Sequence, residues 1–142
     1  MARDQQSVAG IEEGRVKALS EKILGVTLVV YIALDILLTP LAGFETRPVA
    51  RVTAVGFAVL ALLFVGLAIG LVSLVMLLRR SPRAGTFAIV AAVLYLPAVI
   101  AEQTGHFSAL SPPAAIERIE LLQAAVALVL VGVGFSRRRQ RP

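Results

Sequence analysis

A single acidic residue interrupts the first long apolar stretch of this chain. Asp35 lies within residues 23–44, and no other residue of those 22 is charged. A helix of that length can cross the hydrocarbon core of a bilayer. An aspartate near the middle of such a helix raises the free energy of insertion by roughly 2.5 to 3.5 kcal/mol. A partner, a bound proton or a function must offset this insertion free energy, so Asp35 is the first candidate for a functional residue.

Hydroxyl-bearing side chains share the helical face of Asp35. They recur at every fourth residue, at Thr27, Tyr31 and Thr39. Residues four apart lie on one face of a helix, and polar groups in a membrane turn toward protein or water. Two interpretations stay open: Asp35 exchanges protons and cations, or it makes a structural hydrogen bond to Gln123, to Tyr95 or to a backbone carbonyl.

A second polar group falls at the junction of the third and fourth apolar stretches. Its members are Glu102, His106, Glu117 and Glu120. Carboxylates and an imidazole three or four residues apart on a helix can ligate a divalent metal. The same residues also suit an acidic mouth that attracts cations, or ordinary helix ends, where glutamate complements the helix dipole. Because Gly105 is expected to end a helix before His106, we predict no metal site and no cofactor.

Composition indicates the class of fold that must position these side chains. Hydrophobic residues make up 58% of the 142 and charged residues only 16%, against about 25% charged in typical soluble domains. The apolar residues form long runs without a polar face at period 3.6. We predict an all-α integral membrane bundle of four transmembrane helices, at about residues 23–44, 52–78, 84–103 and 116–135. An N-terminal leader (1–22) and a basic tail (137–142) flank this domain (23–136).

Basic residues predict the orientation. Eleven of the fourteen lie in the leader, in the turn near residue 80 and in the tail, and only Arg47, Arg51 and Arg118 lie on the other side. Since basic loops stay in the cytoplasm, both termini are expected to be cytoplasmic. The use of 12 Arg against 2 Lys favours a bacterium, and hence the bacterial cytoplasmic membrane. The net charge of +5 follows from these loops, so no nucleic-acid partner is expected.

Small residues predict where helices approach closely. The second stretch contains a GxxxG motif, Gly66 and Gly70, followed by Ser73, and the third has alanines at spacing four. Such residues let helix backbones come together in a membrane. The motif can serve packing inside the bundle or a homodimer.

Absent residue types exclude several chemistries. The chain has no cysteine and one histidine, which excludes disulfides, cysteine nucleophiles and cysteine-based zinc sites. No serine–histidine–acid set, phosphate-binding glycine loop or HExxH motif is present. An enzyme is therefore not the favoured interpretation.

In outline, four short apolar helices with one acid in the first resemble the small multidrug-resistance transporters. In that family a glutamate of the first helix binds drug cations and protons. This chain has Asp35 instead, lacks tryptophan and is longer, so the resemblance covers architecture alone, which carries little functional weight.

Counting about 20 residues per span from the basic ends leads to the main functional prediction. Asp35 and Gln123 fall at similar depth in the outer half of the membrane, and Glu102 and Glu120 fall nearer the outer surface. We expect an outward-facing polar pocket that binds or transports a small molecule or a cation, formed by Tyr31, Asp35, Thr39, Tyr95, Glu102, Glu120 and Gln123.

Two alternatives concern other classes of protein. One is an accessory or scaffold subunit that packs through the second stretch, in a homo-oligomer or against a partner membrane subunit. The other is a lipid-modifying enzyme, which would need the acidic group to hold a metal.

Overall fold

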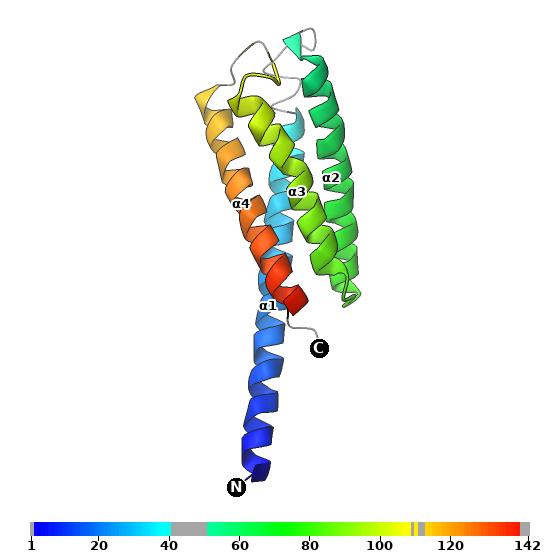
Figure 1. Ribbon diagram of the computed structural model, residues 1–142, viewed down its shortest axis with the longest axis vertical. Coiled ribbons are helices and arrows are strands. Elements are labelled where there is room, and N and C mark those ends of the chain that lie inside the picture. Colours follow the sequence, from blue (N-terminus) through cyan, green and yellow to red (C-terminus); the bar gives the residue numbers. More distant parts are fainter. Residues whose placement is uncertain (1, 41–50, 109, 111–112, 140–142) are drawn as a thin grey trace.

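The computed structural model is a bundle of four α-helices that run along one long axis (Figure 1). Their bounds are α1, Ala2–Pro40; α2, Ala54–Leu78; α3, Ala84–Gln103; and α4, Ala114–Arg139. The structure describes residues 2–40, 51–108, 110 and 113–139, and side chains within 14–38, 51–108, 110 and 113–138. Within these ranges the strand pairing consists of one isolated bridge between Val52 and Ser108.

Three of the helices are long and apolar enough to cross a membrane, namely α2, α3 and α4. The predicted all-α class is thus confirmed, and so are three helices suited to spanning. α1 differs because a charged N-terminal half precedes its apolar half. The prediction that α1 also spans the membrane is taken up below.

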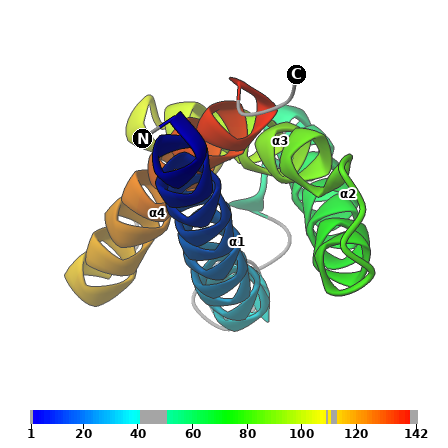
Figure 2. The same cartoon turned by 90° about the horizontal axis from the view of Figure 1, so that it is seen from below.

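Each helix packs against two neighbours in a closed order: α1 on α2, α2 on α3, α3 on α4, and α4 on α1. Figure 2, which looks along the bundle, shows α1 between α4 and α2. The main core lies where all four helices face inward. It is formed by buried residues of α1, α3 and α4, including Leu24, Leu28, Tyr31, Ala88, Ala91, Tyr95 and Leu130.

Local chemistry explains where the helices begin and end. Thr53 caps the N-terminus of α2, because its hydroxyl accepts a hydrogen bond from the backbone N–H of Gly56 at 2.9 Å. α3 ends at Gln103 and is followed by Gly105, whose φ of +70° is left-handed, and the N–H of His106 then bonds to the carbonyl of Ala101 at 2.8 Å. This is the hydrogen-bond pattern of a Schellman cap. The same pattern ends α2, with Arg80 as the left-handed residue.

The sequence-based boundary of the first helix was wrong at its start. The first span was expected to begin near residue 23, after a leader, but Ser20 already lies inside α1 and its hydroxyl donates to the carbonyl of Lys17 at 2.9 Å. The preceding residues are rich in helix formers such as Ala, Gln, Glu and Arg, so helix continues back to Ala2. As a result, α1 extends well beyond the bundle (Figure 1).

The other boundaries were closer. α3 has the predicted bounds, and α2 starts two residues later than predicted because Thr53 is its cap. α4 is longer at both ends than the predicted 116–135. Several predicted features lie outside the described residues: the end of the first span at 41–44, the loop with Arg47, the side chain of Thr39, and residues 140–142 of the tail.

Candidate functional site

Asp35 of α1 and Gln123 of α4 form a buried hydrogen-bonded pair. The side-chain amide of Gln123 donates from Nε2 to Oδ1 of Asp35 at 3.3 Å. Their exposed fractions are 1% and 0%. Oε1 of Gln123 is also buried and has no hydrogen-bond partner within the described part of the chain. The pair therefore joins two helices and still keeps an acceptor available.

Two tyrosines pack beside this pair. Tyr31 of α1 donates to the carbonyl of Ala91 of α3 at 3.0 Å. Tyr95 of α3 donates to the carbonyl of Glu120 of α4 at 3.3 Å. The two rings meet edge to face, with centroids 6.2 Å apart, a favoured aromatic geometry. The two hydroxyls thus link α3 to both α1 and α4.

A pocket opens next to Asp35 and Gln123. Its cavity volume is about 40 Å³, whereas roughly 10–15 Å³ is enough for one bound water. Its wall contains residues of all four helices and of the turn after α3: Asp35, Leu38, Leu60, Leu63, Tyr95, Ala98, Val99, Glu102, Gln103, Phe107, Glu120 and Gln123. Three carboxyl side chains are in this wall, and none of these twelve residues is basic. The pocket can thus hold a few waters or a small ligand next to acidic groups.

The acidic group predicted at the outer end divides into two parts. Glu102 and Glu120 are half-buried and line the pocket, whereas His106 and Glu117 are exposed and are not part of its wall. His106 contacts its neighbour Thr104, with Nδ1 and Oγ1 2.9 Å apart. Among the described residues, no three His, Asp or Glu side chains gather closely enough to hold a metal ion.

The turn after α3 closes the rim of the pocket. The hydroxyl of Thr53 contacts the carbonyl of His106, and the N–H of Thr53 bonds to the carbonyl of Phe107 at 3.1 Å. Phe107 is buried and its side chain is part of the pocket wall. The backbone of α2 comes so close here that a Cβ on Gly56 would collide with the Phe107 carbonyl. The start of α2 therefore holds the backbone of Phe107 in place.

The GxxxG motif of α2 faces the interior. Gly66 and Gly70 are buried, and a Cβ added to either would contact Ala91 of α3 and Tyr31 of α1 at 3.4–3.9 Å. Ser73, one turn further on, donates to the carbonyl of Ala84 at 2.8 Å. The motif and Ser73 thus pack α2 against α1 and α3, and the motif lies next to Tyr31. Thr39, predicted on the face of Asp35, has no described side chain.

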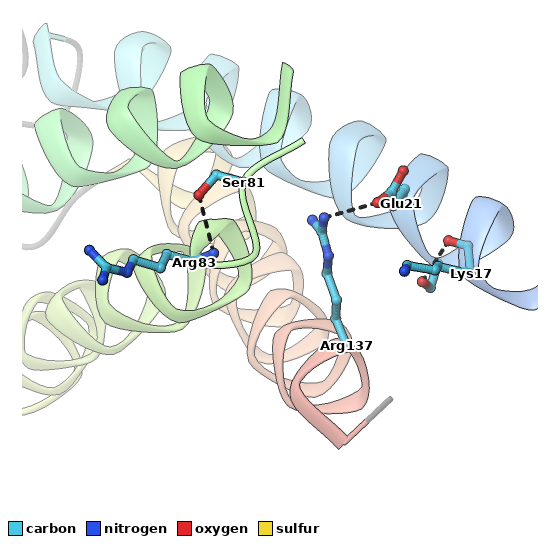
Figure 3. Close-up of polar contacts among 6 residues, drawn as sticks. Lys17, Glu21, Ser81, Arg83 and Arg137 are labelled. Carbon is cyan, nitrogen blue, oxygen red and sulfur yellow. Dashed lines mark hydrogen bonds and ion pairs between the residues drawn. The ribbon is translucent and has the colours of Figure 1, made fainter. Parts of the chain in front are cut away.

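Sequence reasoning did not identify two contacts at the opposite end of the bundle. α3 and α4 touch at Gly85 and Gly134, where a Cβ on Gly134 would lie 2.9 Å from the carbonyl oxygen of Gly85. Nearby, Arg137 of α4 is only 9% exposed and its Nη2 lies 3.0 Å from Oε1 of Glu21 of α1. Figure 3 shows the guanidinium reaching across to Glu21. The tail had been interpreted only as basic residues flanking a membrane span.

The fold and its three long apolar helices define the class as an α-helical membrane protein. Comparisons with protein-family models, curated proteins and solved structures found no match to this chain. The function is therefore argued from the pocket alone.

Proposed function

We propose that the protein crosses the bacterial cytoplasmic membrane four times and uses the pocket beside Asp35 to bind, and to carry across, a small molecule or cation. The apolar half of α1 supplies the fourth span. Eleven of fourteen basic residues fall on the side of the N-terminus, which supports cytoplasmic termini. The pocket is at the other end of the bundle and would then open outward.

One observation carries the proposal. Asp35 and Gln123 are fully buried, bonded to each other, and yet part of a cavity wall. The bond to Gln123 is the structural contact that the sequence left open, but the pair also borders a cavity. Here the wall also includes the carboxyl groups of Glu102 and Glu120. Acidic groups in a low-dielectric cavity attract a cation more strongly than they would in water.

The buried oxygen of Gln123 supports the same function. Buried polar atoms in proteins are nearly always hydrogen-bonded, to protein or to bound solvent. Oε1 of Gln123 is an acceptor without a partner in the described residues. A ligand that carries an N–H donor, or a hydrated cation, would supply the missing bond.

The test is tracer uptake into liposomes that contain the wild type, Asp35→Asn or Glu117→Gln. Rubidium and methylammonium serve as probes, with and without an imposed pH gradient. Asp35→Asn removes the charge but keeps an oxygen that can accept from Gln123, so the bundle should remain folded. Glu117→Gln removes an exposed acid from outside the pocket wall.

We expect saturable uptake in the wild type and in Glu117→Gln, and none above empty liposomes in Asp35→Asn. Equal uptake in all three proteins would contradict the proposal. A wild type that neither transports nor binds either probe, with binding followed by calorimetry, would also contradict it for cations of this size.

Two observations bear on the alternatives. The GxxxG motif, which suggested packing against a partner, is buried inside the bundle. The enzyme would need a metal, and no candidate cluster occurs among the described side chains.

A further inference from the structure

The N-terminal half of α1 stands apart from the bundle. Glu21 marks the level at which the bundle ends, because it is bonded to Arg137 in the last turns of α4. Figure 1 shows α1 continuing beyond this level along the same axis. Arg15 and Lys17 of this part are charged and exposed, so it lies in water.

Two large apolar side chains are nevertheless exposed on this charged segment. Val16 is 54% exposed and Leu19 58% exposed. The membrane surface cannot cover them while α1 continues in the direction of the bundle axis, because an interfacial helix lies in the plane of the membrane. A second helix packed along this segment would remove them from water.

Val16 and Leu19 begin a stripe that runs along α1 at alternating spacings of three and four residues. Its seven members are all apolar and all exposed: Val16, Leu19, Ile23, Val26, Val30, Ala33 and Leu37. A strict seven-residue repeat over three heptads is the pattern of a left-handed coiled coil. The stripe lies roughly 140° around the helix axis from the residues of α1 that face the bundle. The bundle therefore leaves the whole stripe uncovered.

The outer face of α2 shows why this stripe differs from ordinary contact with lipid. Phe57, Phe64 and Leu71 are also exposed at seven-residue spacing. They lie within an uncharged helix that can span the membrane, so lipid is a sufficient cover for them. The stripe of α1 instead crosses from the apolar half of the helix into the charged half.

We propose that this stripe of α1 pairs with the same stripe of a second copy of the chain, forming a parallel two-stranded coiled coil. Copies inserted in one orientation necessarily present α1 in parallel. The first heptad positions hold Val16, Ile23, Val30 and Leu37, and the fourth positions hold Leu19, Val26 and Ala33, so the pattern below applies in full to the first heptad, the one in the charged half of α1. β-branched residues at the first position with leucine at the fourth favour two parallel strands.

The charges that flank the stripe permit this pairing. In a parallel pair, Arg15 of one copy faces Ser20 of the other, and Lys22 faces Thr27. Both partners are uncharged, so no like charges oppose each other. Lys17 and Glu21 lie outside the seam, and Glu21 keeps its bond to Arg137. The pairing is independent of the pocket and does not rest on the proposed function.

The chain has no cysteine, so one introduced thiol can report the pairing. Leu19→Cys places the thiol in the seam, and Ala18→Cys places it one residue away on an exposed position. Both full-length variants would be placed in liposomes at a series of lipid-to-protein ratios and oxidised with a copper–phenanthroline catalyst. We expect a disulfide-linked dimer with Leu19→Cys at all ratios, and little with Ala18→Cys.

Leu19→Asp and Ala18→Asp provide a second measurement without cross-linking. Single-molecule photobleaching in liposomes would give the monomer–dimer equilibrium. Placing a charge in the seam should lower the association constant roughly tenfold or more, while Ala18→Asp should leave it within the error of the wild type. Both positions lie outside the bundle, so the far-UV circular dichroism of both variants should match that of the wild type.

Several results would overturn the proposal. Equal cross-linking at positions 18 and 19, cross-linking that disappears on dilution with lipid, or equal monomer fractions for the two aspartate variants would each exclude a seam. A cross-link from Leu19→Cys to a different protein in intact cells, without the homodimer, would assign the stripe to another partner.

Discussion

Asp35 and Gln123 show how an apolar bundle accommodates two polar side chains. They are 88 residues apart in the sequence and are joined by a single hydrogen bond of 3.3 Å. The net value of such a bond is modest, but a buried group that loses its partner retains its full desolvation penalty. The free energy of unfolding should therefore fall when one of the two side chains is removed, and fall by less than the sum of the single losses when both are removed.

The variants Asp35→Leu, Gln123→Leu and the double variant would measure this asymmetry. Gln123→Leu should lower the free energy of unfolding by about 1–3 kcal/mol, because Asp35 loses its amide donor. The double variant should be more stable than the sum of the single changes predicts, with a coupling of roughly 0.5–3 kcal/mol. Unfolding in mixed detergent micelles, followed by circular dichroism, would give these values.

If the stability losses of the two single variants simply add up in the double variant, the two side chains act separately. Leu121→Ala provides a control on the same helix, since Leu121 is exposed and outside the pocket wall. It should change stability far less than Gln123→Leu does.

The level of each polar side chain along its helix could be predicted from the sequence. A helix rises by a constant amount per residue, so counting from the basic ends placed Asp35 and Gln123 at one level, where the structure joins them. The rotation of each helix about its axis does not follow from such counting. For that reason Leu60 and Phe107 of the pocket wall were not predicted.

At the scale of helices, the contact of α3 with α4 depends on the absence of two side chains. A Cβ on Gly134 would lie 2.6 Å from Cγ1 of Ile89 and 2.9 Å from the carbonyl oxygen of Gly85. The second of these atoms belongs to a helix backbone and cannot move alone. A larger residue at position 134 must therefore push the two helices apart.

Gly134→Ala should lower the free energy of unfolding by about 1–3 kcal/mol, as overpacking of a tight contact does. Gly132→Ala is a matched control two residues away, because nothing lies within 4 Å of its added Cβ. That change should be neutral or stabilise α4 by up to about 1 kcal/mol, through the higher helix propensity of alanine. The measurement is the same unfolding experiment, and equal destabilisation by both changes would contradict the tight contact.

Helix boundaries were predicted well where capping residues are local. α3 lies between a Ser-Pro-Arg turn and Gly105 and has its predicted bounds. α1 was predicted to start too late, because a change from charged to apolar residues was interpreted as a helix start. Charge and helix formation are separate properties, and residues 2–22 form helix while remaining polar.

At the scale of the whole molecule, the two ends of the bundle differ in charge and in role. The pocket wall at one end contains three carboxyl groups. The other end contains Arg79, Arg80 and Arg83 in the turn after α2, and Arg137 bonded to Glu21. Basic loops stay on the cytoplasmic side of a membrane, where anionic lipids also attract them. This asymmetry therefore predicts a single orientation in the membrane.

Single-cysteine variants in intact cells test that orientation. His106→Cys and Pro82→Cys place exposed thiols at the pocket end and at the turn after α2. A membrane-impermeant maleimide added outside should label His106→Cys, and should label Pro82→Cys only after the cells are permeabilised. The reverse labelling pattern would show the opposite orientation, and labelling of both variants in intact cells would indicate a mixture of the two orientations.

The unbroken course of α1 has a mechanical consequence. Asp35 and the first turn of the helix lie on one rod of 39 residues, and the distance between them is about 50 Å. A tilt of about 5° near Asp35 would displace the far tip by roughly 4 Å if the rod stays rigid. A change of contacts around one buried carboxyl group would thereby become a measurable movement at the far end of α1, beyond the opposite end of the bundle.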